Sequence, residues 1–139
     1  MTTGTAIAAE AENWLGVPFH WQGRVKAGCD CKGLIAGVAA NCGRHEGKSL
    51  QALAGDYSDR VDSAALLRGM AALFDPVTER KAGDVLVLMV SGKPQHLAIA
   101  ASTEAKPSRT IQALHTGPQK VVAMRVPRAT VHSIWRWRD

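Results

Sequence analysis

A cysteine and a histidine in this chain occupy positions where nucleophilic chemistry is possible. Cys31 follows Asp30, a residue type that favours helix N-caps, so it takes the first position of a predicted helix. Backbone N–H groups at a helix start have no partner within the helix, and their partial positive charge favours the nucleophilic thiolate. His96 begins an apolar stretch typical of a strand, and a histidine beside a cysteine can act as its general base. The pair predicts a cysteine hydrolase, whereas an inert core thiol and a core histidine are the alternatives.

A third polar residue could orient the histidine ring. Gln112 lies inside an apolar strand pattern, where its side chain has a defined direction, and an amide can hold an imidazole by a hydrogen bond. His115 is the rival for this role, and an ordinary exposed strand position is the other interpretation of Gln112. We favour Gln112, although an uncharged amide does not stabilise an imidazolium ion as a carboxylate would.

Metal binding is the competing use of the cysteines. Structural zinc normally takes four ligands, commonly from two spaced pairs, but the chain has a single Cys-x-Cys, formed by Cys29 and Cys31. Cys42 lies about three turns further along the predicted helix, and Cys29 precedes the N-cap. We therefore expect no metal and no organic cofactor. Three cysteines are an odd number, which favours a reducing compartment over a disulfide framework.

Hydrophobic periodicity predicts helices in the first half of the chain. One helix is expected over 5–15, a second from Cys31 to a stop at Gly43, and a third over 63–74. Gly33 and Gly37 weaken the second helix, so they indicate a closely packed neighbour.

The second half of the chain is typical of strands with short connections. Strands are expected at 85–90, 96–101, 109–114, 120–126 and 132–137. Helices followed by strands predict an α+β fold, with N-terminal helices packed on a central antiparallel sheet of about five strands.

Composition limits the classes of protein to consider. The chain has 139 residues, 46% of them hydrophobic, which suits a single domain over 1–139. No apolar run reaches the length of a membrane span, and the N-terminus lacks a secretory signal, so we expect cytoplasmic synthesis without a signal peptide.

The net charge of +5 suggests an anionic partner, such as a cell-wall polymer, nucleic acid or an acidic protein face, unless it is only a solvated basic surface. Much of the excess lies near the C-terminus, in Lys120, Arg125, Arg128, Arg136 and Arg138. Trp135 and Trp137 alternate with arginines as in a half-buried strand, so no specific nucleic-acid binding is expected.

An ordered set of motifs spans nearly the whole chain. It comprises Trp14–Gly23, Asp30–Leu34, Gly83–Leu88 and His96–Ile99. The set resembles the NlpC-type cysteine peptidases, which are bacterial cell-wall hydrolases with a papain-like core. The resemblance implies a papain-like fold and hydrolysis of peptidoglycan stem peptides.

The resemblance also implies roles for individual residues. Cys31 would be the nucleophile, His96 the base and Gln112 the orienting residue. The residues expected at the substrate are Phe19, His20, Trp21 and Asp30.

Three residues depart from the family pattern. Phe19 replaces the usual tyrosine, Lys32 the usual serine, and Gln112 the common histidine. They motivate an alternative in which the chain is a structural or binding module with little or no catalysis.

The short length of the chain and two of its motifs resemble a narrower group than the family as a whole. Gly28–Cys31 before Gly33-Leu34, together with the Trp135–Trp137 ending, resembles the branch found in tailed phages and gene transfer agents. Members of that branch are cell-wall peptidases at the tail tip. This resemblance implies tail-tip or hub proteins as partners, residence in a particle tail, and action in the periplasm or cell wall. A cellular amide or thioester hydrolase unrelated to phage is a further alternative.

Overall fold

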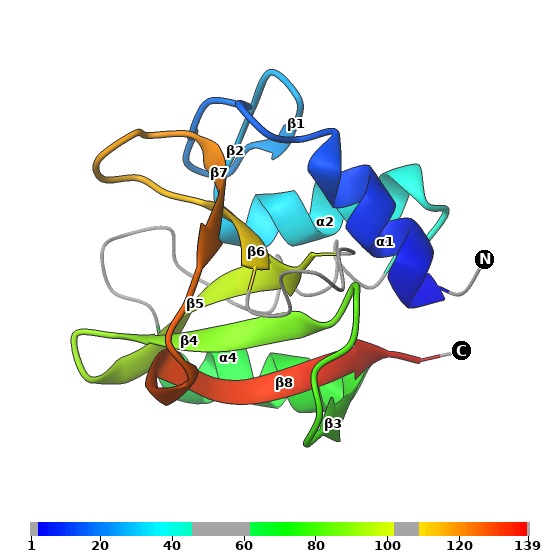
Figure 1. Cartoon of the computed structure of the whole chain (residues 1–139), viewed down its shortest axis with the longest axis vertical. Coiled ribbons are helices and arrows are strands. Elements are labelled where there is room, and N and C mark those ends of the chain that lie inside the picture. Colours follow the sequence, from blue (N-terminus) through cyan, green and yellow to red (C-terminus); the bar gives the residue numbers. More distant parts are fainter. Residues whose placement is uncertain (1–2, 46–61, 102–108, 139) are drawn as a thin grey trace.

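The computed structural model describes residues 3–45, 62–101 and 109–138, and it has an α+β architecture (Figure 1). The helices are α1 (Thr3–Glu12), α2 (Cys31–Asn41), α4 (Ser63–Leu73) and the short 3-10 helix η1 (Arg128–Thr130). The strands are β1 (Arg24–Val25), β2 (Gly28–Cys29), β3 (Phe74–Val77), β4 (Val85–Val90), β5 (Lys93–Ala100), β6 (Arg109–Ala113), β7 (Val121–Arg125) and β8 (Val131–Trp137). None of the helices in these ranges is long and apolar enough to span a bilayer.

Within the described ranges, the main sheet is antiparallel and has six strands in the order β3-β8-β4-β5-β6-β7. The α+β class is therefore confirmed, and the sheet has one strand more than expected. The additional strand is β3, whose first residue, Phe74, is the last residue of the third helix predicted over 63–74. Phe74 pairs with Trp137 and packs its ring edge-on against that indole, with ring centroids 4.8 Å apart. This contact joins residues far apart in sequence, so local periodicity did not indicate it.

The first helix is shorter than predicted. α1 ends at Glu12, and a turn leads to Gly16, whose φ of +89° suits glycine. Trp14 lies in this turn and is still fully buried, whereas Leu15 is 39% exposed and does not share the buried face. The strands expected from Val85 onward all form.

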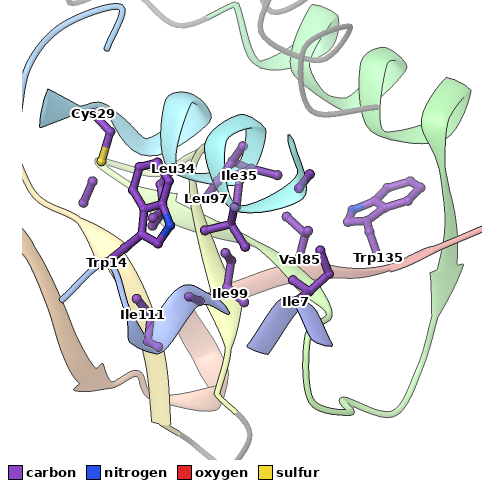
Figure 2. Packing of buried hydrophobic residues seen from close by; sticks show 14 of the residues in the cluster. Ile7, Trp14, Cys29, Leu34, Ile35, Val85, Leu97, Ile99, Ile111 and Trp135 are labelled. Atoms are coloured by element: carbon purple, nitrogen blue, oxygen red, sulfur yellow. The ribbon is translucent and has the colours of Figure 1, made fainter. Parts of the chain in front are cut away.

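Apolar side chains from the helices and the sheet meet in one core (Figure 2). Ile7 of α1 and Leu34 and Ile35 of α2 face Leu97 and Ile99 of β5. A smaller cluster formed by Leu86, Leu88 and Ala98 covers the other face of β4 and β5, so β4 is buried on both faces, which suits its continuous apolar run.

The two glycines of α2 mark close contacts, as expected. A Cβ added to Gly33 would lie 1.6 Å from the backbone oxygen of Gly23, and one added to Gly37 would lie 2.2 Å from the indole of Trp14. The first turns of α2 are thus pressed against the loop before β1 and against Trp14. This packing holds the helix start, and with it Cys31, in a defined position against the sheet.

Candidate active site

Asp30 starts α2 and ties it to the preceding loop. Its Oδ1 accepts the N–H of Gly33 at 2.6 Å, which is the N-cap bond, and its Oδ2 accepts the N–H of Gln22 at 2.9 Å. The predicted helix start at Cys31 is confirmed. Asp30 was expected at the substrate, and it does line the groove described below, but both carboxylate oxygens are held by backbone N–H groups.

The electrostatics of Cys31 differ from the sequence-based expectation. Burial, reinforced by the charge of Asp30, raises the pKa of the half-buried Cys31 thiol to about 11. The N–H groups of Leu97 and Lys32 and the Lys32 charge favour the thiolate but do not compensate. The prediction of a low pKa is therefore wrong, because desolvation outweighs the helix start. Leu97 follows His96 on β5, so the contact with its N–H also places the Cys31 sulfur beside that strand.

Thiol alkylation tests this protonation state. At pH 8 Cys31 should react with iodoacetamide about 100-fold more slowly than a free cysteine peptide, because a pKa near 11 leaves little thiolate. Peptide mapping by mass spectrometry separates Cys31 from the other cysteines, and the rate should keep rising above pH 9. Half-maximal labelling below pH 8 would contradict the prediction and indicate a resting thiolate.

His96 is held by Gln112. Its Nε2 lies 2.9 Å from the Gln112 Oε1. Burial lowers the pKa of His96 below its ordinary value, the charge of His115 lowers it further, and the Gln112 hydrogen bond opposes both. Since Nε2 contacts Gln112, Nδ1 is the ring nitrogen left for proton exchange.

His115, the rival for the orienting position, lies elsewhere. Its ring packs against Phe19 and Trp21, with centroids 5.7 and 5.4 Å away. The structure thus places Gln112, and not His115, against the His96 ring. His115 contributes instead to an aromatic cluster with the loop that precedes β1.

A groove of about 640 Å³ contains the predicted chemistry-bearing residues. Cys31, His96 and Gln112 all line it. Phe19 and Trp21 form part of its wall, as expected for residues near a substrate. His20 was also expected there, but it is exposed, bonds through Nδ1 to the Trp21 carbonyl oxygen, and is not among the lining residues.

Other lining residues were not among those expected at the substrate. Lys32 lies on the groove although it is only 6% exposed. The groove is also lined by β7 and the segment after it, through Met124, Val126, Pro127 and Thr130. These residue types also occur at ordinary strand and turn positions, so only the tertiary structure reveals that they line the same groove as Cys31.

The other two cysteines lie away from this arrangement. Cys29 is fully buried in the core, and desolvation raises its pKa to about 12. Cys42 is at the far end of α2, with its sulfur 3.6 Å from the Ala6 carbonyl oxygen. Among the residues that the structure describes, no group of three or more His, Cys, Asp or Glu side chains could hold a metal ion.

A helix packed by its N-terminal turn against an antiparallel sheet, with a groove at the junction, defines the papain-like class of fold. Within that class the chain belongs to the NlpC/P60 family, whose family model matches residues 16–135. Members of this family are cysteine peptidoglycan hydrolases. No curated protein sequence matches the chain.

Solved structures agree with this assignment. The NlpC/p60 domain of the peptidoglycan hydrolase SagA is 27% identical, with a TM-score of 0.63 over 96% of this chain and 98% of that one. The peptidoglycan hydrolase RipB from Mycobacterium tuberculosis is 21% identical, with a TM-score of 0.62 over 96% and 63% of the two chains. NlpC2 from Trichomonas vaginalis is 18% identical, with a TM-score of 0.67 over 98% and 47%. The last two show the shared fold alone, and this chain spans less than two thirds of each.

Proposed function

We propose that this protein hydrolyses an amide bond in the stem peptides of peptidoglycan, with Cys31 as nucleophile. One observation carries the proposal: a thiol at the start of α2 shares a groove with a histidine whose ring is held by Gln112. The family supplies the substrate class. No metal or organic cofactor takes part in the proposed reaction.

In the first half of the reaction, Nδ1 of His96 takes the Cys31 proton while the sulfur attacks the carbonyl carbon. The oxyanion accepts a hydrogen bond from the backbone N–H of Cys31. His96 then gives the proton to the leaving amine as the C–N bond breaks, which leaves a thioester. In the second half, His96 deprotonates a water that attacks the thioester, and the Cys31 thiol is restored with release of the acid.

The pH profile should follow from His96. The reaction needs neutral imidazole, and burial lowers the pKa of His96, so the neutral form persists below pH 6.5. We expect kcat/KM to be constant from pH 7.5 down to 6.5 and to fall about tenfold per pH unit only below the lowered pKa. Initial rates of fragment release, measured at several pH values and constant ionic strength, give this pH profile. An acid limb with its midpoint above 6.5 would contradict the assignment.

Mass spectrometry of fragments released from purified peptidoglycan tests the function directly. The wild-type protein should release peptides with a newly formed carboxyl end, and their masses identify the bond that is cut. The Cys31→Ala variant should release no detectable fragments over the same time. Fragment release by that variant would disprove the mechanism.

We further propose that the protein belongs to the tail tip of a phage-like particle and opens the cell wall for DNA delivery. The similarity of its Gly28–Cys31 and Trp135–Trp137 motifs to those of tail-associated peptidases supports this, and the exposed Arg125 and Arg128 provide basic surface for an anionic partner. Tail or hub proteins would be its partners, and the cell wall or periplasm its place of action. Proteomic analysis of purified particles should detect it, and its absence from complete particles would refute the proposal.

A binding module with little catalysis is the second candidate. The raised pKa of Cys31 and the absence of a tyrosine hydroxyl at Phe19 favour it. In that case the wild-type protein would sediment with peptidoglycan without releasing fragments.

A further inference from the structure

A buried series of hydrogen bonds leads from His96 to the backbone of β7. Beyond the contact of His96 with Gln112, the Gln112 Nε2 donates to Thr110 Oγ1 at 2.9 Å, and Thr110 Oγ1 donates to the Met124 carbonyl oxygen at 2.8 Å. Thr110 is fully buried and Gln112 is 3% exposed. Thr110 and Met124 are also cross-strand partners on β6 and β7. The series therefore ends on the backbone of the sheet.

The Met124 carbonyl oxygen determines which group donates and which accepts in every bond of the series. A carbonyl oxygen only accepts, so the one hydroxyl hydrogen of Thr110 points at it. The Thr110 oxygen is then left to accept, and only the NH₂ group of Gln112 can face it. The amide oxygen is consequently turned toward His96, whose Nε2 must carry the ring proton.

We propose that Thr110 is a positioning residue that selects the tautomer of His96 through the orientation of the Gln112 amide. The inference rests on the proposed function, in which the unprotonated Nδ1 receives the Cys31 proton. If the amide turned over, its NH₂ would donate to Nε2 and the ring proton would move to Nδ1. The ring could then no longer accept a proton from Cys31. Threonine suits this task because its branched side chain has few rotamers on a strand.

Thr110→Val and Thr110→Ser separate this role from simple packing. Valine keeps the shape but removes the acceptor, which leaves the buried NH₂ of Gln112 unpaired in its present orientation. We expect kcat to fall about tenfold or more with KM unchanged within about twofold, since Thr110 does not line the groove. Serine keeps the hydroxyl and should retain kcat within about threefold.

Nitrogen-15 NMR of the His96 ring at pH 7.5 gives a readout that needs no hydrolysis. The wild type and Thr110→Ser should show the proton on Nε2, and Thr110→Val should show a population with the proton on Nδ1. A wild-type ring protonated on Nδ1, or a folded Thr110→Val variant with the wild-type tautomer and kcat, would overturn the proposal. If the Thr110→Val variant does not fold, the spectra of the wild type and Thr110→Ser still test the proposal, because both must show the His96 ring proton on Nε2. If the wild type releases no fragments, the proposed hydrolysis fails while the tautomer result stands on its own.

Discussion

Cys31→Ala should lower the rate of fragment release from peptidoglycan by at least about 10³-fold, because it removes the atom that forms the thioester. The substitution removes one sulfur atom from a half-buried position at the start of α2, where alanine is a good helix residue. The Asp30 cap and the His96–Gln112 contact do not involve that sulfur. The loss should therefore occur in kcat, with little change in the free energy of unfolding.

Cys42→Ala is the matched control for this experiment. Cys42 is also half-buried on the same segment but lies at the opposite end of α2, against Ala6. Its rate of fragment release should stay within about twofold of the wild type. Equal losses in the two variants would show that a cysteine is needed for stability and not for chemistry. A retained rate in Cys31→Ala would exclude the thioester mechanism, whatever the control shows.

Gly33→Ala should have the largest effect on stability, a loss of about 3 kcal/mol or more in the free energy of unfolding. The added Cβ would lie 1.6 Å from the Gly23 backbone oxygen and 3.0 Å from the Asp30 Oδ1. The Gly23 oxygen belongs to the backbone and cannot change rotamer as a flexible side chain does, so the first turn of α2 must move. Movement of that turn also disturbs the hydrogen bond from the Gly33 N–H to the Asp30 carboxylate. The rate of fragment release should therefore fall together with the free energy of unfolding.

Urea-induced unfolding measures this change, and Ala40→Gly provides the comparison. Ala40 is an exposed position of the same helix, where glycine should cost about 1 kcal/mol through backbone entropy alone. If Gly33→Ala costs less than Ala40→Gly, the close contact with Gly23 is not a feature of the protein in solution.

Local chemistry explains which parts of the site were predictable. An aspartate that caps a helix acts within one turn, so the position of Cys31 at the helix start followed from Asp30 and was confirmed. The close approach at Gly33 and Gly37 was predictable for a similar reason, since glycine inside a helix is costly and indicates a constraint.

Non-local contacts explain the errors. β3 was missed because its partner, β8 (Val131–Trp137), is far from it in the sequence, and only that pairing makes Phe74 the start of a strand and not the end of a helix. The sheet contains six strands for the same reason. The contribution of Met124 and Pro127 to the groove could likewise not be predicted from their own residue types.

The sequence by itself determined the class of fold, the family, and the positions of Cys31 and His96 on a helix start and a strand. It did so because capping, periodicity and turn chemistry act over a few residues. Only the tertiary structure decided that Gln112 and not His115 contacts His96, and that burial raises the pKa of Cys31. Hydrogen-bond partners and desolvation depend on which strands meet and what excludes water, and neither is a property of a short stretch of chain.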